Sequence, residues 1–361
     1  MSPEGVGAYA QVNATTRALY SKLLSQATWE RLIQAQNFEV VLSVLSKTEA
    51  YAPHLDIDRT LLTPRRTVYQ IKNHLSRTYE KLIRISPEPG RQLLIQLWRL
   101  YEVDNLKATL RGIETGASWN QVLFVLSPMA RPSVLSTALL EEMVRSGDVE
   151  RAIRLTEGTP YYDTLSHAME RYREEQSLFP LEVALDLDYY RALWQIVNEL
   201  TGLDHEWAVQ LIGSVIDINN LMWAARYRIF HHLSQEEIIN YTLPFGYQVT
   251  DEDIRTVASG GDVTAVIARI YPEIREAMAH PQAPEAGLRA LEQALEQILI
   301  QRCHEAMRRG APFHIGVQVA YLMLTEFEIR DLTVLIEAKA TNMPAEFFEP
   351  LLEIQHPDIM G

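Results

Sequence analysis

The stretch Val103-Asp104-Asn105-Leu106 is the most informative part of this chain, because two similar stretches follow it, Ile218-Asn219-Asn220-Leu221 and Ile329-Arg330-Asp331-Leu332. Positions 105 and 220 are 115 residues apart, and positions 220 and 331 are 111 apart, each close to a third of the 361 residues. A chain built from three similar units usually forms a shaped scaffold rather than one catalytic cleft. We therefore predict three helical units, over residues 1–113, 114–230 and 231–361.

The segments after the first two stretches repeat as well. Ser118 and Ser234 are each placed to cap a short helix, and Ser234 with Glu237 matches a capping box. Further on, Asp148 and Asp262 each precede the start of an apolar helix, and they are 114 residues apart. The third copy of this pattern is truncated, and the N-terminal segment matches only part of the pattern. We therefore expect residues 9–24 to pack near residues 329–342 in a closed, roughly threefold arrangement.

Apolar residues recur at helical spacing through most of the chain, as in the stripe formed by Leu75, Tyr79, Leu82 and Ile83. Clean alternation of the strand type is rare, and the 16 glycines are few for a turn-rich sandwich or barrel. The fold class that we predict is all-α.

In each copy of the motif the apolar positions fall on one face of a helix, so Leu106, Leu221 and Leu332 are predicted core residues. The Asn or Asp before each leucine lies off that face, and such residues are poor helix formers. One interpretation is structural, in which the side chain bonds a neighbouring helix or a backbone group. The other is a polar surface lining a central opening.

On the second interpretation, residues seven positions after the polar ones return to nearly the same face and extend the patch. The candidate partner-interface or socket-lining residues are then Asp104, Asn105, Arg111, Asn219, Asn220, Arg226, Arg330, Asp331 and Glu337.

The net charge of −14 disfavours nucleic acid as a partner. Residues 1–120 carry 15 basic and 11 acidic side chains, whereas the remainder carries 18 and 36. This asymmetry indicates either ordinary solvated faces or an acidic surface that meets a basic partner. No apolar stretch of the sequence is long enough to span a membrane.

The usual signatures of catalysis are absent from the sequence. There is no phosphate-binding loop, no nucleophile elbow and no His-Glu-x-x-His pattern. His167 and Glu170 are spaced as a metal-binding pair, but no second pair accompanies them. Cys303, the single cysteine, lies in an apolar stripe typical of a buried thiol in a reducing compartment. We expect no cofactor, no metal and no enzymatic activity.

The motif helices resemble those of the C subunit of the A/V-type rotary ATPases, the counterpart of the d subunit of the eukaryotic V-ATPase. The residues that carry this resemblance are 98–107 with Gly116, 216–221, and the last helix from Gly316 through Tyr321 into 326–339. The opening Tyr9…Asn13-Ala14-Thr15-Thr16-Arg17 is similar to that family's Tyr-x-Asn-Ala-Arg-x-Arg. It departs from it by one inserted residue and by Thr15 in place of the first Arg.

This resemblance implies a pseudo-threefold funnel of three similar helical lobes with a central opening. It implies a non-catalytic central-stalk protein on the cytoplasmic face of the membrane, peripheral to it. The implied partners are the D and F subunits of the rotary ATPase shaft and the membrane proteolipid ring, and the implied role is to transmit torque for ion transport. The alternatives are a helical-repeat adaptor with another protein partner and a helical-bundle enzyme, whose acid-rich motifs are missing.

Overall fold

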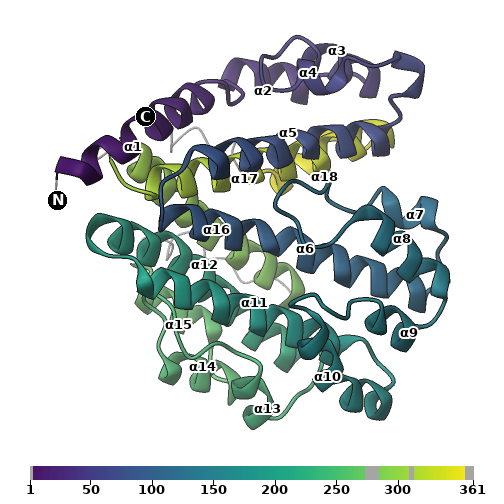
Figure 1. Cartoon of the computed structure of the whole chain (residues 1–361), viewed down its shortest axis with the longest axis vertical. Helices are drawn as coiled ribbons and strands as arrows, with labels where there is room; N and C mark the ends of the chain where they lie inside the picture. The colour runs from purple at the N-terminus through teal and green to yellow at the C-terminus, as the bar shows by residue number, and fades with distance from the viewer. Residues whose placement is uncertain (1–2, 273–283, 309–312, 354–361) are drawn as a thin grey trace. The chain divides into compact units, whose positions relative to one another are not determined.

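The computed structural model describes residues 3–272, 284–308 and 313–353, and within these ranges every regular element is helical (Figure 1). The all-α prediction is therefore confirmed for the described part of the chain. The α-helices are α1 (Pro3–Tyr20), α2 (Gln26–Ile33), α3 (Phe38–Leu45), α4 (Ala52–Leu55), α5 (Pro64–Ile85), α6 (Gly90–Glu114), α7 (Trp119–Leu123), α8 (Thr137–Ser146), α9 (Val149–Arg154), α10 (Tyr162–Glu175), α11 (Phe179–Glu199), α12 (Gly202–Phe230), α13 (Gln235–Asn240), α14 (Asp251–Ala258), α15 (Val263–Ile270), α16 (Pro284–Arg308), α17 (Gly316–Ala340) and α18 (Ala345–Phe348). Two short 3₁₀ helices, η1 (Arg59–Leu61) and η3 (Glu349–Leu351), also lie within the described residues.

The chain divides into two compact units. Among the described residues, the first contains residues 3–9 and those between 194 and 324, and so holds the start of α1, the end of α11, α12 to α16 and the beginning of α17. The second contains residues 10–193 and 325–355, and so holds α2 to α10, most of α1 and α11, and the rest of α17. The division into three units at residues 113 and 230, and their arrangement as a funnel, stay predictions.

The predicted repeat is visible in the local structure. The three motif copies lie on the long helices α6, α12 and α17, and each of these helices begins at a glycine. Each is followed by a short helix, α7, α13 or α18. Capping boxes at Ser118 and Ser234 start α7 and α13, because serine and the acidic or amide residue three positions on satisfy the first free N–H groups.

The predicted helix starts downstream are confirmed too. The Asp148 side chain accepts a hydrogen bond from the N–H of Arg151 at the start of α9, and Asp262 accepts one from Thr264 at the start of α15. The same capping position in the N-terminal segment is held by Asn37, which accepts from Val40 at the start of α3.

The N-terminal segment meets the C-terminal helix within the second unit. The backbone N–H of Leu24 donates to Glu328 of α17 at 2.7 Å, and Lys339 donates to the carbonyl of Ile33 at 2.6 Å. The end of the segment 9–24 thus lies next to α17 at Glu328, one residue before the predicted range 329–342, and the closed threefold arrangement stays a prediction.

Candidate functional site

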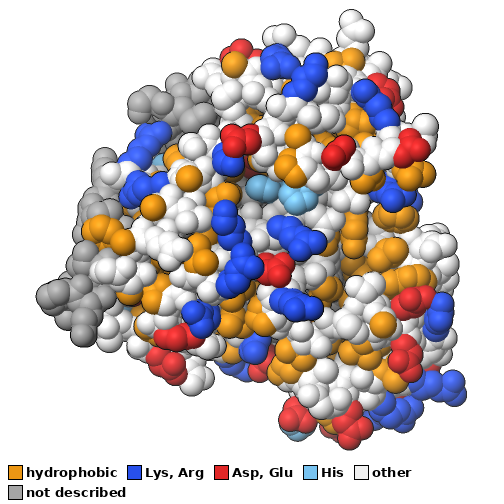
Figure 2. All heavy atoms as spheres, turned by 45° about the horizontal axis from the view of Figure 1, so that its top comes forward, with side chains coloured by type: hydrophobic (Ala, Val, Ile, Leu, Met, Phe, Trp, Pro, Cys, Tyr) orange, Lys and Arg blue, Asp and Glu red, His pale blue; other side chains and the backbone are white. Residues whose placement is uncertain are grey.

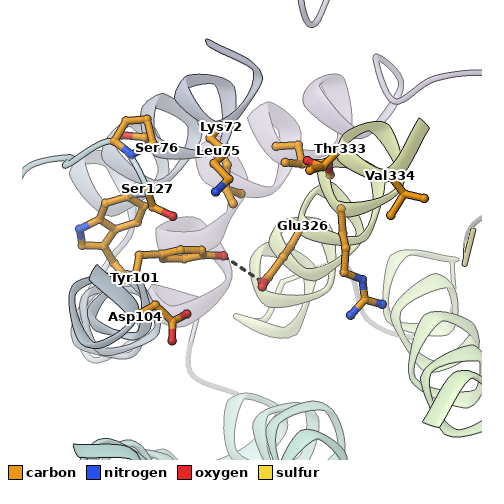
Figure 3. Close-up of a pocket in the computed structure, with 13 residues that line it drawn as sticks. Lys72, Leu75, Ser76, Tyr101, Asp104, Ser127, Glu326, Thr333 and Val334 are labelled. Atoms are coloured by element: carbon orange, nitrogen blue, oxygen red, sulfur yellow. Dashed lines mark hydrogen bonds between the residues drawn. The ribbon is translucent and has the colours of Figure 1, made fainter. Parts of the chain in front are cut away.

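The candidate site is a cavity of about 320 Å³ in the second unit, between α5, α6 and α17 (Figure 3). Its apolar wall includes Leu75, Trp98, Ile329 and Val334. The polar groups that border it come from all three helices and from the loop after α7. They are Lys72 and Ser76 on α5, Tyr101 and Asp104 on α6, Ser127 in the loop, and Glu326, Arg330 and Thr333 on α17.

Helical spacing brings these residues to the cavity. On α17 the positions 326, 329, 330, 333 and 334 follow steps of three and four, which return to one helix face. On α6 the residues Trp98, Tyr101 and Asp104 are three apart and lie along one side of the helix. The cavity therefore depends on two motif helices, α6 and α17, with α5 as the third wall.

A hydrogen bond joins the two motif helices at this cavity. The Tyr101 hydroxyl donates to a Glu326 carboxylate oxygen at 2.9 Å (Figure 3). Burial, and next the Glu326 charge, raise the pKa of Tyr101 far above its usual range, so the hydroxyl keeps its proton. Trp98 packs against Tyr101 with ring centroids 4.9 Å apart and donates to Ser133 at 2.8 Å. Tyr101 and Trp98, which form the α6 wall of the cavity, are therefore each held by a hydrogen bond to a residue outside α6.

The cations at the cavity have different surroundings. Burial lowers the pKa of Lys72, although the carboxylates of Asp104 and Glu337 oppose that shift. No hydrogen bond or ion pair of the Lys72 ammonium to another described residue is found. The Arg330 guanidinium lies 4.8 Å from the centre of the Phe327 ring.

Of the predicted interface residues, the cavity brings Asp104 and Arg330 together. Asp104 is half exposed and pairs with Lys107 at 3.0 Å, which also binds Asp186 at 2.7 Å. Glu337, one turn beyond the cavity on α17, is exposed and acts on Lys72 through its charge.

The other predicted charged residues lie outside this cavity. Arg111 is bound by both carboxylate oxygens of Glu182, one of them at 2.9 Å. In the first unit, Arg226 pairs with Glu292 of α16 at 2.6 Å, and Asn219 is half buried on α12.

The polar residue before each motif leucine has a structural role in all three copies. Asn105 is 1% exposed, Asn220 2% and Asp331 0%, so their side chains lie inside the chain. Asn105 accepts from the N–H of Ser127 at 2.7 Å and donates to its carbonyl at 2.9 Å. Asn220 does the same with Leu243, at 2.8 and 2.9 Å.

In the third copy a carboxylate replaces the amide. Both oxygens of Asp331 accept the N–H of Glu353, at 3.0 and 2.9 Å. The partner lies 22 or 23 positions downstream in every copy, just past the short helix. This is the structural interpretation of the motif: a buried polar side chain ties the returning loop to the long helix. The motif leucines Leu106, Leu221 and Leu332 are each 0% exposed, in agreement with their prediction as core residues.

Residues that the sequence did not single out complete the site. Lys72 lies beside the apolar stripe of α5, and Glu326 carries no signal that distinguishes it from other helix acids. Glu328 of α17 does not line the cavity, but the sequence did not single it out either; it accepts from the Leu24 N–H at 2.7 Å and from the Tyr51 hydroxyl at 2.7 Å. Burial raises the pKa of Glu328 to about 7. Their partners are distant in sequence, so spacing could not reveal them.

Among residues 3–272, 284–308 and 313–353, no three His, Cys, Asp or Glu side chains gather as a metal site. Burial raises the pKa of the Cys303 thiol, so the thiol stays protonated and is a poor nucleophile. What the cavity presents is an apolar hollow with charged rims, a form suited to binding.

In the described ranges, no helix combines the length and apolar character that crossing a bilayer requires. The described residues thus form an all-helical protein with a cavity and three repeated loop ties.

The chain belongs to the ATP synthase (C/AC39) subunit family, whose model matches residues 12–350. It is similar to the C subunit of the A-type ATP synthase of Methanocaldococcus jannaschii, with 24% identity over 95% of this chain and 86% of that protein. The same name belongs to relatives from Archaeoglobus fulgidus, 24% identical over 95% of both chains, and from Methanothermobacter thermautotrophicus, 23% identical over 92% and 84%. The resemblance to the C subunit of the A/V-type rotary ATPases is thus confirmed.

Proposed function

We propose that the chain is the non-catalytic central-stalk component of an A/V-type rotary ATPase. It joins the shaft formed by the D and F subunits to the membrane proteolipid ring on the cytoplasmic face. In this position it transmits torque between ATP chemistry and ion transport. The family match over residues 12–350 carries this proposal, since it covers nearly the whole chain.

The cavity between α5, α6 and α17 supports a shaft contact on this protein. It combines an apolar hollow with Lys72, Asp104, Glu326 and Arg330 on its rim. A contact that must form and release during assembly favours polar rims over a large apolar seam. We place the shaft at this cavity, with Asp104 and Arg330 as contact residues.

The three-lobed funnel is part of the same proposal. The loop ties at Asn105, Asn220 and Asp331 repeat one local design three times. Three such units around an axis would present α6, α12 and α17 to a central opening. In that arrangement, further candidates for shaft contacts are Arg111, Asn219, Arg226 and Glu337. The three buried residues would not contact the shaft and would instead hold the loops that support the central helices.

Binding of the purified chain to purified partners tests the proposal. Biolayer interferometry is run with an immobilised D–F shaft pair and, separately, with the proteolipid ring in detergent. We expect saturable binding to both, and loss of ATP-driven ion transport when the chain is omitted from the reconstituted complex. Binding to neither partner would instead favour a helical-repeat adaptor with another protein partner.

A further inference from the structure

One side of α5 carries a straight row of cations, which are Arg66, Arg77, Lys81 and Arg84. They are separated by steps of eleven, four and three residues, so at about 100° per residue they lie within roughly 60° of the helix circumference. Three of them are exposed and Arg66 is half-buried. We call these four residues the basic stripe. At a rise of about 1.5 Å per residue, the stripe is about 27 Å long.

The basic stripe lies on the side of α5 that is opposite to the cavity. The buried residues Val68, Leu75 and Leu82 are about 130–170° from the middle of the stripe at the same 100° per residue. Lys72, which borders the cavity together with Leu75, is about 150° away. The stripe therefore faces away from the core and from the cavity at which the proposed function places the shaft.

The cations of the stripe have few partners within the chain. Arg77 lies 3.6 Å from Glu80, the single acidic residue of α5, in a solvent-accessible pair. For the side chains of Arg66, Lys81 and Arg84, no ion pair or hydrogen bond to another described residue is found. Figure 2 shows Lys and Arg side chains gathered in the middle of the face that it presents, with few acidic ones among them. The stripe is therefore net positive, although the whole chain carries −14.

This contrast in charge favours a narrow anionic partner over a broad one. A membrane surface would face a whole side of a net acidic chain, whereas a partner about 10 Å wide meets mainly the stripe. Charges more than about 10 Å away are largely screened at 0.1 M salt. No residue of α5 is among the exposed large apolar side chains, which a helix needs in order to insert between lipids. The observations thus favour an acidic protein segment over a lipid surface.

The spacing of the stripe fits a partner helix better than a partner strand. Side chains on one face of a helix recur about every 5.4 Å, which is also the pitch of α5. Side chains on one face of a strand recur about every 6.8 Å and would lose register along the stripe. Gln70 and Asn73 fill the gap between Arg66 and Arg77, and their amides can donate to further acceptors.

We propose that the basic stripe of α5 is the docking surface for an acidic helix of a protein partner, which lies along α5. The Arg77 and Arg84 guanidinium groups and the Lys81 ammonium bind carboxylates of that helix, and Arg66 binds its far end. These pairs are open to solvent, so the contact sets orientation and register and dissociates readily in salt. The proposal goes beyond the proposed function, because the stripe does not border the cavity assigned to the shaft.

The probe is a fluorescein-labelled Ala/Gln-based helical peptide of about 20 residues, with glutamates at alternating steps of four and three so that they form one stripe. A second peptide of the same composition has its glutamates spread around the helix. Fluorescence anisotropy measures the affinity of the full chain for each peptide. The variant of the chain neutralises the three exposed cations of the stripe with a good helix former, as Arg77→Gln, Lys81→Gln and Arg84→Gln.

The matched control makes the same change in net charge at exposed arginines of α9, α11 and α14, as Arg154→Gln, Arg191→Gln and Arg255→Gln. We expect the unaltered chain and the control to bind the striped peptide at least about fivefold more tightly than the spread peptide, and the stripe variant to lose this preference. At 1 M salt the preference should vanish for all three, because the Debye length falls to about 3 Å. Circular dichroism should show unchanged helicity for both variants.

Three results would overturn the inference. The first is equal affinity of the unaltered chain for the two peptides, or no binding of either. The second is an equal loss of binding for the stripe variant and the control. The third is binding to vesicles of phosphatidylglycerol and phosphatidylcholine that the stripe variant loses while its peptide affinity is unchanged, which would assign the stripe to a membrane surface instead. Since none of these assays contains the shaft or the ring, their outcome is separate from that of the proposed function.

Discussion

Neighbouring residues of the motif have opposite environments in the second unit. Asn105 and Asp331 are buried and hold loop backbone, whereas Asp104 and Arg330, each one position earlier, line the cavity. Successive residues on a helix are about 100° apart, so one faces the core and the other faces outward. A single polar dipeptide on a helix therefore places one side chain in the core and the other at the cavity.

The two kinds of buried residue also differ from each other. An amide both donates and accepts, so Asn105 and Asn220 satisfy the N–H and the carbonyl of one loop residue. A carboxylate only accepts, so Asp331 takes the Glu353 N–H with both oxygens. The third tie therefore fixes its loop with a different set of bonds at the same position.

Among the substitutions at buried motif positions, Leu332→Ala should lower the stability of the chain most. The side chain is fully buried, so we expect the free energy of unfolding to fall by about 2–5 kcal/mol. Urea unfolding followed by circular dichroism measures this loss. Leu61→Ala, at a half-exposed position, is the control and should change stability by less than about 0.5 kcal/mol. Equal losses for the two variants would show that Leu332 is not a core residue.

A pH-dependent test concerns Glu328, another buried polar residue of α17. Its pKa rises from 4.5 to about 7 on folding, so the protonated form favours the folded state. The stability that this proton provides is present below pH 4.5 and is lost as the pH rises through about 7. Glu328→Gln keeps a neutral side chain at every pH. Relative to the unaltered chain, the free energy of unfolding of the variant should therefore rise by about 3 kcal/mol between about pH 4.5 and about pH 8.

The measurement is the difference in unfolding free energy between the two proteins at each pH. His54 and His74, which lie near Tyr51, are present in both proteins, so their titration cancels in the difference. A difference that does not vary with pH would mean that Glu328 ionises normally in the folded chain.

The loop tie is tested by Asn220→Leu. This change leaves the N–H and carbonyl of Leu243 without their bonds in a buried place. Buried backbone groups that lack hydrogen-bond partners reduce the free energy of unfolding by about 2–3 kcal/mol. Asn198→Leu, at an exposed position of α11, is the matched control. Similar unfolding free energies for both variants would contradict a structural role for Asn220.

The smallest effect on stability is expected on the cavity side, from Asp104→Asn. The side chain is half exposed, and its ion pair with Lys107 is shared with Asp186. Stability should change by less than about 0.5 kcal/mol. Shaft binding, measured by interferometry, should nevertheless change, because in the proposed function the carboxylate borders the shaft contact. A large loss of stability without any change in binding would reverse the comparison between the two motif positions.

Local patterns in the sequence were sufficient for several features. The helix starts at Asp148, Asp262 and Ser234 follow from capping chemistry, which involves residues only two or three positions apart. The motif leucines follow from helical periodicity. The candidate site was predicted less completely, since Asp104 and Arg330 were selected but Lys72 and Glu326 were not.

The sequence by itself determined the helical class, the repeated motif and the family, because these depend on short-range periodicity and on residue order. Only the tertiary structure decided which polar motif residue is buried and which borders a cavity. It also placed an unmatched cation, Lys72, beside Trp98 and Val334, which are 26 and 262 positions away in the chain. The physical reason is that burial and charge balance depend on neighbours that packing brings together, and residue spacing along one helix does not specify those neighbours.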